Sequence, residues 1–288
     1  MSDGKIGFIG LGNMGGPIAA NIAGGGHDMI VFDAAGTADR APAGTRIAAS
    51  IAEVAAAAET IFLSLPDGPV VAAVAEEIAE SNARVTSTLV DLSTIGIAAA
   101  QQVHARLSRA DIAYLDAPVS GGTAGAKAGT IAVMCGGDKA LFERLSPVLS
   151  SMSRNVFHVG DTPGQGQAMK LANNFLSATA MAATSEAVAF GVEQGLDMGQ
   201  MLDVLNASSG QNTATSDKFP NRILPDKYDA GFTNTLMTKD VTLYLQNVRA
   251  AGTPDTVAAT LTDVWQRFQA AEPGADFTRI YPFVRDKR

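Results

Sequence analysis

The 288-residue sequence contains little cysteine and little charge. Its single cysteine, Cys135, excludes an internal disulfide and any metal site built from several cysteines. Charged residues make up 17% of the chain and hydrophobic residues 47%, a balance that favours a compact globule over a disordered chain. The formal net charge of −8 argues against nucleic acid or an anionic membrane surface as a partner.

Signals for export, membrane insertion and metal binding are also missing. The first residues, MSDGKIGFIGLG, lack the basic segment and the clean apolar run of a signal peptide. Residues 168–192 are long enough to cross a bilayer, but Lys170 and Glu186 interrupt them. No two of the three histidines have the spacing of metal ligands on a helix. We therefore expect a soluble, cytoplasmic protein with no metal and no membrane partner.

Short apolar runs alternate with alanine-rich helical runs in the first half of the chain. The strand-like runs are residues 5–10, 28–33, 60–66, 87–93, 113–120, 130–137 and 155–160. The helical runs between them are residues 13–25, 50–58, 70–80 and 98–107. This alternation predicts an α/β domain with a doubly wound, mostly parallel sheet.

The second half of the chain has a helical pattern throughout. A long apolar helix ending near residue 194 is followed by helical segments at 198–208, 238–252 and 254–271. The patterns predict a sheet domain over 1–162, an interdomain helix over 163–194 and an all-helical domain over 195–288.

A glycine pattern joins the first predicted strand to the first predicted helix. Gly10 suits a tight turn, Gly12 lets a pyrophosphate approach the backbone, and Gly15 lets the helix pack on the strand. The loop residues between these glycines are Leu11, Asn13 and Met14. The helix N-terminus then offers N–H groups and a positive dipole end to phosphate. With a strand before it and a helix after it, the pattern predicts a Rossmann-type dinucleotide site.

Asp33 ends the second predicted strand and bears on the choice of cofactor. A carboxylate there accepts hydrogen bonds from the adenosine ribose hydroxyls and repels a 2′-phosphate. NADP sites usually carry Arg, Ser or Thr at this point, whereas here Arg40 comes seven residues later. We predict NAD, with NADP as the alternative. The competing interpretation is that Asp33 only caps the following loop.

A second glycine-rich segment covers residues 116–137. Successive glycine N–H groups beside the Ser120 hydroxyl would form a concave site for an anion such as a carboxylate. The competing interpretation is a turn between two strands that binds nothing.

Four blocks of the sequence together resemble the β-hydroxyacid dehydrogenase family. They are, in chain order, FIGLGNMGGPIAANI, DAPVSGGTAGAKAGT, GQGQAMKLANN and LMTKD. This family includes 3-hydroxyisobutyrate dehydrogenases and semialdehyde reductases, and it resembles 6-phosphogluconate dehydrogenases. The resemblance implies a Rossmann domain, a long interdomain helix and an all-helical domain for substrate binding and oligomerisation. It also implies hydride transfer between a nicotinamide cofactor and a small β-hydroxy acid or its semialdehyde, in a homodimer or homotetramer.

The resemblance places the catalytic lysine at Lys170, and the chemistry of the residues agrees. Hydride transfer to a carbonyl builds negative charge on oxygen, which must receive a proton. An ammonium on an apolar helix can supply that proton, because a water-poor site favours the neutral amine. Asn174 lies one turn further on the same face, whereas Asn173 points about 100° aside. The competing interpretation is a lysine that extends from the helix end into water.

Further site residues are assigned by the resemblance alone. For substrate binding it implies Ser120, Gly121, Gly122, Thr94 and Phe232. For cofactor binding it adds Leu65, Pro66, Thr94 and Lys239. Competing interpretations are that Thr94 caps a helix and that Lys239 is a surface lysine paired with Asp240.

Four alternatives differ from a lysine-dependent, NAD-preferring dehydrogenase. The main one is an NADPH-dependent glyoxylate or succinic semialdehyde reductase, against which Asp33 argues. Imine reductases usually lack a lysine at the position of Lys170, and 6-phosphogluconate dehydrogenases have a much longer helical domain. A non-catalytic binding module would typically have lost the lysine. The residues fit several short hydroxy acids and either direction of reaction.

Overall fold

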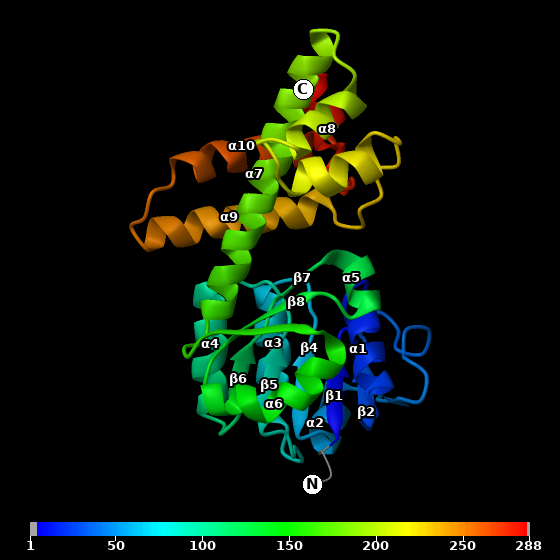
Figure 1. Ribbon diagram of the computed structural model, residues 1–288. Helices are drawn as coiled ribbons and strands as arrows, with labels where there is room; N and C mark the ends of the chain where they lie inside the picture. The colour runs from blue at the N-terminus through cyan, green and yellow to red at the C-terminus, as the bar shows by residue number, and fades with distance from the viewer. Residues whose placement is uncertain (1–4, 287–288) are drawn as a thin grey trace. The chain divides into compact units, whose positions relative to one another are not determined.

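A computed structural model describes residues 5–286 of the chain. They form two compact units, of which one ends at Lys170 and the other starts at Leu171 (Figure 1). The division falls inside the long helix α7 (Gln165–Glu193). The boundaries near residues 162 and 194 stay predictions.

The first unit is built on a nine-stranded sheet within the described residues. Its strands are β1 (Ile6–Ile9), β2 (Met29–Phe32), β3 (Arg46–Ile47), β4 (Thr60–Leu63), β5 (Thr88–Asp91), β6 (Ala113–Asp116), β7 (Val119–Ser120), β8 (Ala132–Gly136) and β9 (Asn155–Gly160). The strand order is β3-β2-β1-β4-β5-β6-β8-β7, with β9 paired to β8. β1 pairs in parallel with both β2 and β4, so the chain winds outward in both directions from β1. Doubly wound sheets bind ligands at the carboxyl ends of the strands flanking this switch point.

Helices cover both faces of the sheet. They are α1 (Gly15–Gly24), α2 (Ile51–Ala57), α3 (Gly68–Glu80), α4 (Ile97–Ser108), α5 (Gly122–Ala128) and α6 (Lys139–Met152). Because strand side chains alternate between faces, Phe8 and Phe62 join the core under α1, α5 and α6. Their neighbours Ile9 and Ile61 join the core under α2, α3 and α4. Burial on both faces explains why the strands are almost continuously apolar.

The structure confirms the predicted fold class and corrects several details, one of which is the helix α6, which was not predicted. The predicted strand 113–120 is two strands, since β6 ends at Asp116 and the separate strand β7 pairs antiparallel with β8. Pro118 lies between them and has no N–H to donate to a ladder. The glycine-rich segment contains a short helix, α5, where the sequence suggested only a turn. The two-residue edge strand β3 was not predicted.

The second unit is helical and has its own core. After α7 come α8 (Met198–Asn206), the π-helical segment η1 (Ala214–Ile223), α9 (Asn234–Ala250), α10 (Thr256–Ala271), the 3-10 turn η2 (Phe277–Arg279) and α11 (Ile280–Arg285). Trp265, Phe268 and Phe277 pack together in that core. Helix η1 was not predicted, because it is polar and contains Pro220.

The helix α7 exposes part of its apolar surface. Leu176 and Phe190 are 65% and 68% exposed, although α7 also contributes buried residues to the helical core. By length and hydropathy alone, α7 is the one helix among the described residues that could cross a bilayer. Core helices of soluble proteins have the same composition, so this property decides nothing by itself.

Candidate active site

The first glycine motif forms a tight loop between β1 and α1. Gly10 has a φ of +95°, and a Cβ atom there would overlap the carbonyl oxygen of Ser64. A Cβ atom at Gly15 would overlap the carbonyl oxygen of Gly10, so only glycine lets α1 start this close to the strand. A Cβ atom at Gly12 would meet no atom within 4 Å, so this part of the backbone faces open space. No side chain caps the N-terminus of α1. The loop therefore leaves an approach for a phosphate group at Gly12.

Asp33 follows β2 and contacts the glycine loop directly. Its Oδ2 accepts a hydrogen bond from the Leu11 N–H at 2.7 Å, and its Oδ1 accepts one from the Ala35 N–H at 2.8 Å. Arg40 places Nη1 3.3 Å from Oδ1 and 3.4 Å from Oδ2. Asp33 thus shapes the loop after β2, as the competing interpretation held, and it also lies beside the fingerprint. The ion pair with Arg40 had not been predicted.

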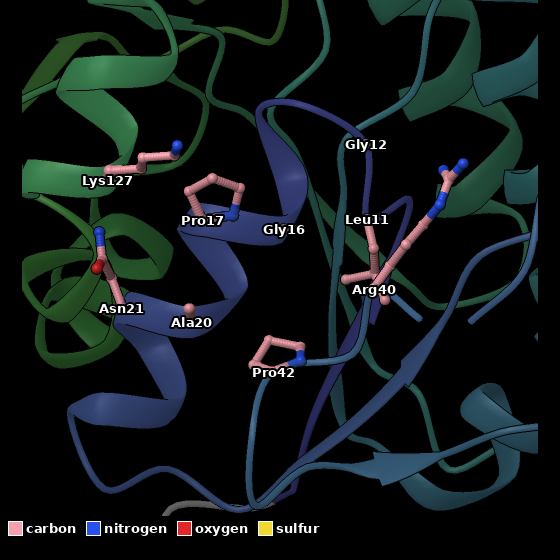
Figure 2. A pocket seen from close by; sticks show the side chains of 9 residues that line it. All are labelled: Leu11, Gly12, Gly16, Pro17, Ala20, Asn21, Arg40, Pro42 and Lys127. Atoms are coloured by element: carbon pink, nitrogen blue, oxygen red, sulfur yellow. The ribbon is translucent and has the colours of Figure 1, made fainter. Parts of the chain in front are cut away.

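A pocket of about 440 Å³ extends from the glycine loop along α1. Leu11 and Gly12 line one end, and Pro17 lies further along the helix. Figure 2 shows Lys127 and Arg40 on opposite sides of α1. Two cations beside a helix N-terminus suit the negative charges of a dinucleotide. The residues present therefore fit a nicotinamide dinucleotide at this end of the sheet.

The second glycine motif joins β7 to α5. Ser120 ends β7, and the next two residues have positive φ angles of +138° at Gly121 and +65° at Gly122. A Cβ atom at Gly122 would meet nothing within 4 Å, whereas one at Gly121 would lie 3.1 Å from the backbone of Ile131. The backbone therefore requires glycine at both positions for its conformation, and open space remains at Gly122.

Lys170 and Asn174 are both buried on α7. They are 7% and 5% exposed, so Lys170 does not extend into water as the competing interpretation proposed. The Asn174 side chain donates from Nδ2 to Asp240 Oδ2 at 2.6 Å. Asn173 donates from Nδ2 to Asn174 Oδ1 at 3.0 Å, so it holds the neighbouring amide.

The sequence suggests Asp240 only as an ion-pair partner of Lys239. It is buried on α9, and its Oδ1 lies 3.3 Å from Lys239 Nζ, which is the ion pair of the competing interpretation. It also accepts the hydrogen bond from Asn174, from a helix 66 residues away in the chain. Phe232 packs edge-on against Phe277 at 5.9 Å between ring centroids, beside the helical core.

The loops after β4 and β5 are tied together. The Leu65 N–H donates to Ser93 Oγ at 2.9 Å, and the Ser93 N–H donates to Asp91 Oδ1 at 2.9 Å. Thr94 follows Ser93, half-buried, and it is not the N-cap of α4, which is Gly96. Pro66, next to Leu65, is exposed. The structure therefore places Leu65 and Thr94 in neighbouring loops at the carboxyl edge of the sheet.

β6 ends in a buried carboxylate whose role the sequence did not reveal. Burial raises the pKa of Asp116 to about 7, and the nearby Asp91 carboxylate adds to the shift. Hydrogen bonds from the N–H groups of Gly164 and Gln167 oppose it. The sequence signal is an aspartate within each of two successive strand-like runs, Asp91 and Asp116, which the structure pairs in register. Within residues 5–286, no cluster of three or more His, Cys, Asp or Glu side chains could hold a metal ion.

Two family models match consecutive parts of the chain. Residues 5–160 match the NAD-binding domain of 6-phosphogluconate dehydrogenase. Residues 164–284 match the model described as NAD-binding of NADP-dependent 3-hydroxyisobutyrate dehydrogenase.

Individual relatives match the chain over nearly its whole length. A 3-hydroxyisobutyrate dehydrogenase of Pseudomonas aeruginosa is 38% identical, covering 98% of this chain and 99% of the relative. The 2-(hydroxymethyl)glutarate dehydrogenase of Eubacterium barkeri is 35% identical, covering 94% and 91%. Among solved structures, the 3-hydroxyisobutyrate dehydrogenase of Mycobacterium tuberculosis with L-serine superimposes with a TM-score of 0.89 at 33% identity, covering 98% and 99%.

Proposed function

This chain belongs to the β-hydroxyacid dehydrogenase family and is an NAD(P)-dependent oxidoreductase acting on CH–OH groups of small hydroxy acids, and on that premise we propose that Lys170 is its general acid and base. The observation that carries the proposal is a lysine 7% exposed on an apolar helix, one turn before the buried Asn174. Burying an ammonium is costly unless it is paired or hydrogen-bonded, and buried ionisable groups are concentrated at functional sites.

The proposed reaction divides into a hydride and a proton. The loop from Gly10 to Gly15 would hold the pyrophosphate of the dinucleotide, and the nicotinamide would supply or accept the hydride. Oxidation of CH–OH to an aldehyde also releases the hydroxyl proton, which the neutral amine of Lys170 takes up. In the reverse direction the ammonium returns that proton to the oxygen. Asn174, held by Asp240 and Asn173, assists from the same helix.

We propose that the substrate is a 3-hydroxypropanoate with a substituent on C2, together with its semialdehyde. This unit is common to 3-hydroxyisobutyrate, L-serine and 2-(hydroxymethyl)glutarate, the compounds named for the relatives. Its constant part is a carboxylate two bonds from the CH₂OH carbon. In this proposal Ser120, Gly121 and Gly122 hold the carboxylate, while Thr94 and Phe232 border the substrate.

For the cofactor we propose a preference for NAD. Asp33 supports it, because its carboxylate lies beside the glycine loop and would repel a 2′-phosphate. Leu65, Pro66, Thr94 and Lys239 complete the proposed cofactor contacts. One observation favours the NADPH-dependent reductase as second candidate: Arg40 already lies against Asp33 and offers a guanidinium to a phosphate.

We further propose a homodimer or homotetramer in the cytoplasm, without nucleic acid or membrane partners. Support for assembly comes from the large apolar side chains that α7 exposes, Leu176 and Phe190. The net charge of −8 supports the absence of polyanionic partners.

A substrate panel tests the proposed function. Oxidation of 3-hydroxyisobutyrate, L-serine, 2-(hydroxymethyl)glutarate, glycolate and 4-hydroxybutyrate is followed by the absorbance of the reduced cofactor, with NAD and with NADP. We expect the highest kcat/KM for one of the first three compounds with NAD. The highest value for glycolate or 4-hydroxybutyrate with NADP would support the second candidate. Activity with none of them would contradict both.

A further inference from the structure

A side chain at the end of strand β6 holds the first turn of helix α7. Asp116, the last residue of β6, is fully buried and accepts two backbone hydrogen bonds from the start of the helix. Its Oδ1 accepts from the Gly164 N–H at 2.7 Å, and its Oδ2 accepts from the Gln167 N–H at 2.9 Å. A carboxylate at a helix N-terminus also meets the positive end of the helix dipole. Asp116 therefore caps α7 across a gap of about fifty residues in sequence.

The Gln167 side chain makes a second connection, from α7 to the loop after β5. Its Oε1 accepts from the N–H groups of Ile95 at 2.9 Å and Gly96 at 3.1 Å. Its Nε2 donates to the Ser93 carbonyl oxygen at 2.9 Å. The bonded backbone groups lie just before and just after Thr94 in the chain. The Gln167 side chain is fully buried. One amide thus fixes the loop that carries Thr94 relative to the helix that carries Lys170.

Two glycines allow this close packing. A Cβ atom at Gly166 would overlap the carbonyl oxygen of Met134 and lie 2.6 Å from Asp116 Oδ2. A Cβ atom at Gly136 would lie 2.5 Å from the Gly166 nitrogen. The helix backbone at Gly166 therefore packs directly against the backbone of β8 and against Asp116 at the end of β6. Packing of this kind leaves little room for the helix to shift or rotate.

We propose that Gln167 and Asp116 are positioning residues for the reaction, which set the placement of Lys170 relative to Thr94 through the first turn of α7. Lys170 follows Gln167 by three residues, roughly 4.5 Å along the helix axis. A rotation or shift of that turn would move the amine with it. The inference rests on the proposed role of Lys170, and neither positioning residue needs to touch substrate.

The main test is Gln167→Met, which keeps the length of the side chain and removes all three hydrogen bonds. With 3-hydroxyisobutyrate and NAD as probes, we expect kcat to fall about 10–100-fold while KM and the Kd of NADH change less than about threefold. The pH at which kcat is half-maximal should also shift. Gln102→Met, the same change at an exposed position of α4, should leave all these values unchanged.

Lys170→Ala separates this inference from the proposed function. In that background Gln167→Met should lower kcat by less than about twofold further, because its effect passes through the lysine. If Gln167→Met lowered kcat in the Lys170→Ala background as much as it does in the wild type, its role would be generally structural. That result would overturn the inference. If Lys170→Ala alone left kcat unchanged, the proposed function would fail first.

Asp116→Asn provides the second variant if Gln167→Met does not fold. It keeps the side-chain volume and one acceptor oxygen, and it replaces the other oxygen with an amide NH₂ group that faces a backbone N–H group. We expect a smaller loss of kcat, about 3–30-fold, again with KM and NADH binding nearly constant. Unchanged kcat in both folded variants would contradict the inference.

Discussion

The two units of the molecule hold their buried polar side chains by different means. In the first unit, carboxylates at strand ends accept hydrogen bonds from backbone N–H groups, as Asp33 does from Leu11 and Asp116 does from Gly164. In the second unit, polar side chains on separate helices meet each other, as Asn174 meets Asp240. A glycine motif marks the loop that Asp33 contacts, because close backbone contact requires glycine, whereas no local pattern marks the contacts of Asp116. The second arrangement leaves no such local signal.

The sheet explains this difference. The carboxyl ends of parallel strands lie at one edge, so residues just after successive strands come together whatever the helices do. Contacts between helices depend instead on how the helices cross. Single substitutions in each unit should therefore have different consequences.

Lys170→Ala should have the largest effect. We expect kcat to fall about 10²–10⁴-fold, the usual loss for a general acid and base, while NADH binds with nearly unchanged affinity. Steady-state kinetics and a fluorescence titration with NADH measure the two quantities. A comparable loss of NADH affinity would show that the lysine belongs to cofactor binding.

Asp116→Asn should change how stability depends on pH. Because the folded-state pKa of Asp116 is raised to about 7, the folded protein keeps a proton that the unfolded chain loses above about pH 4. The free energy of unfolding should therefore fall as pH rises from 4 to 7. Between pH 5 and pH 8 the wild type should lose about 2–3 kcal/mol more than the variant, measured by urea unfolding.

Other ionisable groups lie close to Asp116 and bear on how that experiment is interpreted. Asp91 from β5 faces it and adds to the shift, and Cys135 from β8 has a pKa raised to about 12 by burial and by Asp116. Tyr114 on the same strand donates to Asp91. Burial also raises the pKa of Tyr114 above its usual value, so neither Tyr114 nor Cys135 titrates between pH 5 and 8. If the free energy of unfolding changed equally with pH in wild type and variant, a group other than Asp116 would cause the pH dependence.

Asn174→Ala tests the side-chain pairing in the helical unit. Removal of its amide takes a donor from the buried Asp240 carboxylate, so the free energy of unfolding should fall by about 1–3 kcal/mol. Asn173→Ala, which removes only the half-buried neighbouring amide, is the matched control and should cost less. Equal losses in the two variants would mean that the contact with Asp240 contributes nothing particular.

The smallest effects should come from substitutions of Asp33 and Arg40, the pair proposed to influence the choice of cofactor. Asp33→Ala should narrow the preference for NAD over NADP, because the repelling carboxylate is gone. Arg40→Ala should widen it by about threefold to fivefold, because an exposed guanidinium is worth at most about 1 kcal/mol. Ratios of kcat/KM for the two cofactors give the answer. No change in either variant would place the determinant elsewhere.

Prediction from sequence succeeded where a residue's role depends on its own segment. The apolar runs, the glycine motifs and the helical second half all correspond to elements of the structure. Prediction failed at η1, whose polar residues and Pro220 do not look helical. It also missed Asp116 and Gln167 as structural contacts, since each bonds to residues about fifty or more positions away.

The residues by themselves determined the fold class, the dinucleotide fingerprint and the family, because periodicity and glycine spacing are local properties of a chain. Only the tertiary structure decided that Asp116 and Gln167 fasten α7 to the loop carrying Thr94, and that Arg40 pairs with Asp33. The physical reason is that hydrogen bonds between distant segments are set by how strands and helices pack, which no single segment encodes.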